Sequence, residues 1–240
     1  VTLVREFTAV EDASAVVTHL IRFIANNQLV ATRIVNDGDT LTDIPEIPAK
    51  VGYMQNAPVW SVTDFRNIHE DMTVHAIYTP DVYTITFVID GKVVKTMEVG
   101  YMDTVEGTAF PAIPEKEGYT DTPAKWDVSA VRDVTADCTV TAIYTPNQYN
   151  IELPDNMKGY TLTFLYDDIY YGENFTATIT IEEGYNADKI VVTLNGVAVN
   201  KKYLTVKDHT ILVEIPADEM SRFYGNEGRE LQIEIAGIIS

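Results

Sequence analysis

The chain has 240 residues, of which 46% are hydrophobic and 22% are charged, a balance typical of folded globular domains and unlike that of disordered chains. The formal net charge is −19, from 36 acidic and 17 basic residues. Such an acidic surface repels phosphate groups and anionic headgroups, which excludes nucleic acids and anionic membranes as expected partners. No apolar run of about 18 residues predicts a membrane span. Repulsion between acidic copies favours a monomer.

The N-terminal stretch begins as a strand at residues 1–4. We interpret residues 1–16 as the closing strand of a preceding unit, because residues 4–10 loosely echo residues 74–80. We therefore expect the chain to be a fragment of a longer protein, with export signals and anchor outside it.

An internal duplication follows this stretch. Residues 44–80 and 110–146 are identical at 17 of 37 aligned positions, at a constant offset of 66. Upstream the register continues at an offset of 64, so that Phe23 matches Phe87 and Asp39 matches Asp103. Identity so far above chance predicts two tandem copies of one small unit, repeat 1 at 17–80 and repeat 2 at 81–146.

Each repeat has the same expected order of elements, best seen in repeat 2. Alternation over residues 83–89 predicts a strand with Ile85, Phe87 and Ile89 on one face, and Asp90–Gly91 predicts a hairpin turn. The remaining elements are a returning strand at 93–99, a proline-rich crossing at 110–114, a turn at Gly118–Tyr119, a short strand led by Trp126 and a closing strand at 139–144. Two hairpins joined by a crossing predict a small sheet with one covered face.

The order of these motifs resembles a known repeat. A strand, an Asp-Gly hairpin and Val-Val-Lys-Thr are followed by P-x-I-P-x-K-x-G-Y, a tryptophan and D-x-T-V-x-A-x-Y-T-P. This order resembles the internalin B-type repeat, also called the Listeria–Bacteroides repeat, over more than half the chain. The resemblance implies tandem β-grasp-like units on a Gram-positive surface protein or a related secreted protein, with no catalytic residues. One departure is that Val59 and Lys125 stand where these repeats usually have a glycine before the tryptophan.

Residues 147–240 are not a third copy but a series of short strands. Phe175, Ala177, Ile179 and Ile181 alternate with threonines, as in a sheet with one wet face, and Asn195–Gly196 predicts a hairpin. The predicted strands are 150–153, 160–165, 175–181, 189–194, 197–199, 203–206, 210–215 and 230–235, with a helical turn only at 217–224. This pattern predicts an immunoglobulin-like β-sandwich, so the whole chain is expected to be mostly β.

Catalytic chemistry has little support in the sequence. The four histidines, His19, His69, His75 and His209, fall at spacings that match no metal motif, and no nucleophile-elbow, phosphate-loop or dinucleotide motif is present. The pairs Asp167–Asp168 and Glu182–Glu183 would point to opposite faces of a strand. The single cysteine, Cys138, is interpreted as a structural thiol. We therefore predict a protein that is not an enzyme and uses no catalytic residues, no cofactor and no metal, and calcium binding is left open.

The segment Tyr166–Tyr171 is the candidate ligand-binding site, through Tyr166, Asp167, Asp168, Tyr170 and Tyr171. Aromatic faces stack on the apolar patches of a sugar ring, and carboxylates accept hydrogen bonds from its hydroxyls. The alternative is that these tyrosines pack at a strand entrance with wet hydroxyl groups.

Four aromatic residues are predicted to be structural anchors, because they occupy the same places in both repeats: Trp60, Trp126, Tyr53 and Tyr119. An intramolecular cross-link between a lysine and an asparagine, such as Lys189 and Asn195, is a further alternative for a surface sandwich domain.

Three functional hypotheses follow. The first is a non-catalytic stalk with a presenting or adhesion domain, secreted or attached to a bacterial cell wall, whose short Thr-Pro junctions make it semi-rigid. The second is a module that binds a glycan or an extracellular protein. The third is an accessory part of a secreted polysaccharide-degrading enzyme.

Overall fold

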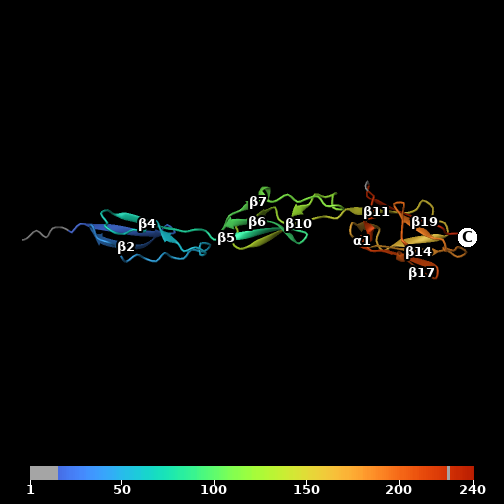
Figure 1. Cartoon of the computed structure of the whole chain (residues 1–240), viewed down its shortest axis with the longest axis horizontal. Coiled ribbons are helices and arrows are strands. Elements are labelled where there is room, and N and C mark those ends of the chain that lie inside the picture. Colours follow the sequence, from blue (N-terminus) through green and yellow to red (C-terminus); the bar gives the residue numbers. More distant parts are fainter. Residues whose placement is uncertain (1–15, 226–227) are drawn as a thin grey trace, which may run out of the picture. The chain divides into compact units, whose positions relative to one another are not determined.

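The structure is a computed structural model that describes residues 16–225 and 228–240 (Figure 1). The strand predicted within residues 1–16 therefore lies, except for Val16, outside the described residues. The described chain forms two compact units. The first comprises residues up to 86 with 95–110 and 129–139, and the second comprises 87–94, 111–128 and 140–240. Repeat 2 contributes to both units, and the predicted domain boundaries after residues 80 and 146 stay predictions.

Repeat 1 is a four-stranded sheet in the first unit, with the strand order β2-β1-β4-β3. Strands β1 (Thr18–Ala25) and β2 (Gln28–Asn36) form an antiparallel hairpin. Its turn residues, Asn26 and Asn27, have φ of 50° and 59°, a left-handed conformation that asparagine tolerates. Strand β4 (Met72–Ile77) pairs in parallel with β1, and β3 (Val59–Trp60) is antiparallel to β4.

Repeat 2 has the same strand order, β6-β5-β10-β8, which agrees with the duplication seen in the sequence. Its strands are β5 (Val82–Ile89), β6 (Lys92–Gly100), β8 (Lys125–Trp126) and β10 (Cys138–Ile143). A small second sheet pairs β7 (Val105–Glu106) with β9 (Ala130–Val131), and a short 3-10 helix, η1, spans Gly107–Ala109.

The predicted strand face of repeat 2 is confirmed, since Ile85 and Phe87 are fully buried and Ile89 is 9% exposed. Asp90 and Gly91 form the predicted turn with φ of 47° and 74°. The expectation of two hairpins is wrong in one respect. In repeat 1, residues 61–71 separate the second antiparallel pair, β3 and β4, and β4 pairs in parallel with β1. Trp126 ends its two-residue strand instead of leading it.

The crossing segment is held to each repeat by a tryptophan. The Trp60 indole N–H donates to the Pro45 carbonyl at 2.9 Å, and the Trp126 indole N–H donates to the Pro111 carbonyl at 3.0 Å. The Trp60 ring lies edge-on to Phe23, with ring centres 5.0 Å apart. In repeat 1 the buried core comprises Ile21, Phe23, Ala25, Val35, Trp60, Phe65, Ile68 and Val74.

The C-terminal domain lies in the second unit and has two sheets, ordered β13-β11-β19-β15-β16 and β12-β14-β18-β17. Its strands are β11 (Gln148–Glu152), β12 (Tyr160–Phe164), β13 (Asp168–Tyr170), β14 (Phe175–Ile181), β15 (Val191–Leu194), β16 (Val197–Ala198), β17 (Leu204–Lys207), β18 (Thr210–Ile215) and β19 (Glu230–Ala236). A 3-10 helix, η2 (Lys201–Tyr203), and a helical turn, α1 (Ala217–Met220), complete it. Strands β11 and β19 are parallel, and the other neighbouring strands in these two sheets are antiparallel.

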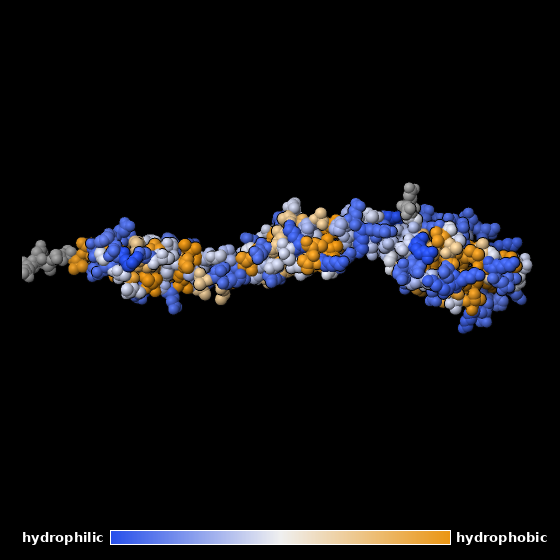
Figure 2. Space-filling model, in the orientation of Figure 1, coloured by the Kyte–Doolittle hydropathy of each residue, from blue (hydrophilic) through white to orange (hydrophobic). Residues whose placement is uncertain are grey.

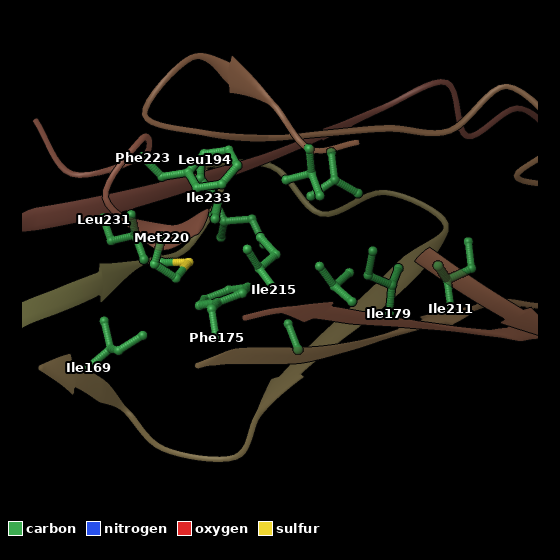
Figure 3. Packing of buried hydrophobic residues seen from close by; sticks show 14 of the residues in the cluster. Ile169, Phe175, Ile179, Leu194, Ile211, Ile215, Met220, Phe223, Leu231 and Ile233 are labelled. Atoms are coloured by element: carbon green, nitrogen blue, oxygen red, sulfur yellow. The ribbon is translucent and has the colours of Figure 1, made fainter. Parts of the chain in front are cut away.

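One core fills the space between these two sheets (Figure 3). Phe175, Ile179 and Ile215 come from one sheet and Leu194 and Ile233 from the other, and all are almost fully buried. Burying an aliphatic or aromatic side chain of this size stabilises a domain by roughly 1.5–3 kcal/mol relative to leaving it exposed. The alternation read from residues 175–181 is confirmed by the burial of its apolar residues.

The chain is thus mostly β, built from several small mixed sheets. All eight strands predicted in the C-terminal domain are present, and β13 is an additional one. Among the described residues, no helix is long and apolar enough to cross a membrane. On the face seen in Figure 2, the apolar surface is divided into separate areas by hydrophilic residues.

Candidate binding cleft in the C-terminal domain

A cleft of about 400 Å³ opens beside the segment that the sequence singled out. Its lining comprises Ile151, Leu165, Tyr166, Asp168, Ile169, Gly172, Glu173, Asn174, Phe175 and Thr176. Leu165 and Tyr166 lie in the connection between β12 and β13 and are 66% and 69% exposed. An apolar wall with an exposed aromatic ring and a few polar groups is a common form of ligand site.

The polar groups of the cleft are oriented by hydrogen bonds to neighbouring elements. The Asp168 carboxylate accepts a hydrogen bond from the Gln148 side-chain amide on β11. Glu173 accepts from the Tyr170 backbone N–H at 3.1 Å, and the Asn174 side-chain oxygen accepts from the Ala217 backbone N–H at 2.8 Å. The carboxylates are therefore held in place, and acceptor groups of this kind suit hydroxyl or amine donors of a ligand.

The structure brings together only part of the predicted site. Tyr166 and Asp168 line the cleft, whereas the exposed Asp167 and Tyr170 and the half-buried Tyr171 are not among its lining residues. Successive residues of β13 point to opposite faces, so Ile169 is buried while Tyr170 is 38% exposed. The predicted residues therefore lie in different surroundings, since only Asp168–Tyr170 form a strand and Tyr166 and Tyr171 lie before and after it.

Tyr171 packs in a different place from Tyr166. Its ring lies 5.7 Å from the Tyr119 ring and 5.2 Å from the Tyr224 ring, centre to centre. Burial raises the pKa of the Tyr171 hydroxyl, and it raises the pKa of the Tyr224 hydroxyl further. Tyr171 is therefore a packing residue at the start of the C-terminal domain.

Sequence reasoning missed several cleft residues, namely Leu165, Glu173 and Asn174. Leu165 falls within the predicted strand 160–165, and no strand is predicted at residues 168–170, so Glu173 and Asn174 are not connected with the aromatic segment. The Tyr-Gly-Glu-Asn stretch at 171–174 contains turn-forming residues and could have indicated a loop next to the aromatic segment.

The predicted anchors Tyr53 and Tyr119 occupy equivalent places. Tyr53 lies edge-on to Tyr78 with ring centres 6.1 Å apart, and Tyr119 lies edge-on to Tyr144 at 5.9 Å. Lys50 lies over the Tyr53 ring, with its Nζ 3.8 Å from the ring centre. Such cation–π contacts contribute about 0.5–1 kcal/mol at exposed sites.

Two of the histidines, His19 and His69, contact one carboxylate. His19 Nε2 and His69 Nδ1 both lie 2.9 Å from one carboxylate oxygen of Asp37. Hydrogen bonds from these two imidazoles lower the pKa of Asp37. No group of three or more histidine, cysteine or acidic residues is placed to hold a metal ion within residues 16–225 and 228–240.

The cross-link alternative receives no support at Asn195. Its side-chain N–H groups donate to the carbonyls of Phe223 at 2.9 Å and Glu230 at 3.0 Å, and its oxygen accepts from the Gln232 N–H at 2.8 Å. The amide is engaged with the backbone of the domain and holds the β15–β16 hairpin against β19.

Fold and sequence together define a mostly β chain with tandem repeats. No family model matches it. The chain is 30% identical to internalin H of Listeria monocytogenes serovar 1/2a over 132 residues, which are 48% of this chain and 23% of that protein. The match thus spans about a quarter of the curated relative, a bacterial protein. A solved structure of Streptococcal High Identity Repeats in Tandem (SHIRT) domains 3-4 from a cell surface protein is also similar, with 17% sequence identity. The match covers 54% of this chain and 99% of the SHIRT chain. Its TM-score of 0.28 is too low to support an argument about fold.

Proposed function

We propose that the chain is a non-catalytic module of a secreted or cell-surface bacterial protein. Two β-grasp-like repeats act as a stalk, and an immunoglobulin-like domain is presented at one end of them. The likeness to internalin H and the internalin B-type motifs support this proposal. The observation that carries it is the repetition of one four-stranded sheet, with one strand order, in consecutive copies. A series of like modules is how proteins gain reach without enlarging a single core.

Small-angle X-ray scattering of the whole chain tests the stalk. A stalk predicts a skewed pair-distance distribution with a long tail, whereas a symmetrical distribution typical of one globular body would overturn the proposal. The measurement needs salt near physiological strength, because a net charge of −19 makes copies repel and distorts the low-angle data.

A second candidate function is ligand binding by the C-terminal domain, and the cleft beside Tyr166 favours it. A neutral glycan or a cationic group of an extracellular protein fits an aromatic ring flanked by two carboxylates better than an anion does.

Binding to an array of glycans and extracellular-matrix proteins tests this second function. Tyr166→Ala is expected to abolish a hit, because it removes the exposed ring at the cleft. Tyr170→Ala is the matched control, since Tyr170 is exposed on the same segment but outside the cleft lining. Loss in Tyr170→Ala alone would move the site off the cleft, and no hit with a folded chain would leave the stalk as the function.

A further inference from the structure

Two buried polar residues stand at the ends of the two repeats. Asp81 follows Pro80 and is 6% exposed, and Asn147 follows Pro146 and is 2% exposed. Among the described residues, these are the only buried side chains with a carboxylate or an amide. A polar group is costly to bury unless its hydrogen bonds are satisfied, so the bonds of these two residues show what the linkers do.

In the first unit, the backbone N–H and C=O of Asp81 are hydrogen-bonded to two different turns. Its N–H donates to the Gly52 carbonyl at 2.7 Å, and its carbonyl accepts from the Tyr101 N–H at 2.8 Å. Its carboxylate accepts from the Gln55 N–H at 2.7 Å. The residue thus joins the Gly-Tyr turn of repeat 1 to the turn that follows β6.

Asn147 makes the corresponding bonds in the second unit. Its N–H donates to the Gly118 carbonyl at 2.7 Å, and its carbonyl accepts from the Tyr171 N–H at 2.9 Å. Its side-chain oxygen accepts from the N–H groups of Thr120 and Asp121, both at 2.9 Å. The side-chain oxygen of Asp81 and that of Asn147 both accept from a backbone N–H, and the Asn147 amide also donates to Thr120 Oγ1 at 3.2 Å.

An aromatic ring is packed on a glycine at each place. Gly52 and Gly118 have φ of +76° and +78°. A Cβ atom on Gly52 would come 2.1 Å from the Tyr101 ring, and one on Gly118 would come 2.2 Å from the Tyr171 ring. The glycine is therefore required both by the backbone conformation and by the ring that lies on it.

The ring that packs on the glycine comes from the next module along the chain, and in both modules it follows a strand that pairs with the first strand of that module. Tyr101 follows β6, which pairs with β5, the first strand after Asp81. Tyr171 follows β13, which pairs with β11, the first strand after Asn147. In repeat 1 the same place holds Asp37, whose N–H donates to the Val17 carbonyl at 2.9 Å and which carries no ring.

We infer that the Gly-Tyr turn and the buried Asp or Asn form a connector that accepts any following module with a tyrosine at this position. The inference rests on the proposed stalk function, and it names what fixes one module to the next. The second connector has an added ion pair, in which the Arg229 guanidinium lies 2.5 Å from the Asp121 carboxylate. Because free linkers leave modules mobile by default, such contacts are what a semi-rigid array needs.

Gly118→Ala in the whole chain tests the connector. Thiol-directed spin labels are attached at two exposed positions through Lys92→Cys and Lys207→Cys, in a chain in which Cys138→Ala removes the native thiol. Pulsed electron paramagnetic resonance then gives the distribution of distances between the two labels. We expect the width of the distribution to rise at least about twofold in Gly118→Ala and in Tyr171→Ala.

Two glycine variants control for strain and for ring displacement. Gly91→Ala carries the same positive-φ strain, at +74°, with no atom within 4 Å of the added Cβ. Gly159→Ala displaces the Tyr185 ring, 2.4 Å from the added Cβ, inside the C-terminal domain and away from both linkers. Both are expected to keep the width of the unmodified chain.

Equal widths for Gly118→Ala, Tyr171→Ala and Gly91→Ala would overturn the connector. If scattering from the unmodified chain still showed a long tail, the stalk would stand without this connector. A symmetrical scattering profile would instead refute the stalk, whatever the label distances. Circular dichroism of each variant checks that its sheets remain folded.

Discussion

Replacing Trp126 by phenylalanine removes the hydrogen bond that holds the crossing segment to repeat 2. The lost indole N–H leaves the Pro111 carbonyl without its 3.0 Å donor, which costs about 1–2 kcal/mol for a partly buried acceptor. The smaller ring also loses packing against Phe87, whose ring centre lies 5.3 Å away, for about 1 kcal/mol more. The unfolding free energy of repeat 2 should therefore fall by about 2–3 kcal/mol.

Amide hydrogen exchange measures this effect strand by strand. In Trp126→Phe, exchange in β10 should accelerate by about 30-fold or more, since each 1.4 kcal/mol is a factor of ten. Trp60 is then the one remaining tryptophan, so its fluorescence reports the unfolding of repeat 1 separately. The free energy of unfolding of repeat 1 should therefore change much less than that of repeat 2.

Trp60→Phe is the mirror experiment, because the Trp60 indole makes the same bond to Pro45 at 2.9 Å. It should accelerate exchange in β4 and leave β10 nearly unchanged. If neither variant changed exchange in its own repeat by more than about threefold, the reasoning that the tryptophans hold the crossing segments would be refuted.

Three further changes probe other parts of the chain. Phe175→Ala, at a residue 1% exposed in the core of Figure 3, should lower the unfolding free energy of the C-terminal domain by about 3–5 kcal/mol in urea titrations followed by circular dichroism, and a loss below about 1 kcal/mol would contradict the packing. Asn195→Ala removes three hydrogen bonds at a φ of 47° and should cost about 2–3 kcal/mol by calorimetry, whereas an unchanged melting temperature would show that the hairpin does not depend on this amide. The pKa of Asp37 lies below its ordinary value of 3.8 because two histidines hydrogen-bond to it. The contribution of Asp37 to folding stability is therefore present above about pH 4 and is lost as the pH falls through the lowered pKa. Carboxyl titration by nuclear magnetic resonance should show this pKa rise in His69→Ala, and an unchanged midpoint would show that His69 does not act on it.

The sequence by itself determined the features that depend on neighbours along the chain. Alternation placed the strands, since a side-chain period of two follows from the strand backbone alone. Asn195–Gly196 and Asp90–Gly91 identified turns, because these residues tolerate positive φ. The duplication predicted one fold twice, and the strand orders of the two repeats agree.

Only the tertiary structure decided which distant segments meet. The parallel pairing of β1 with β4 joins residues about fifty positions apart, and no local pattern specifies it. The sequence predicted only part of the candidate site: Tyr166 and Asp168 line the cleft, whereas the Tyr171 ring packs on Gly118. That direction depends on β13, which has three residues and owes its existence to the pairing with β11. Tyr101 and Tyr171 lie at different sequence separations from Gly52 and Gly118, the glycines on which their rings pack. Their equivalent positions are therefore apparent only in the folded structure.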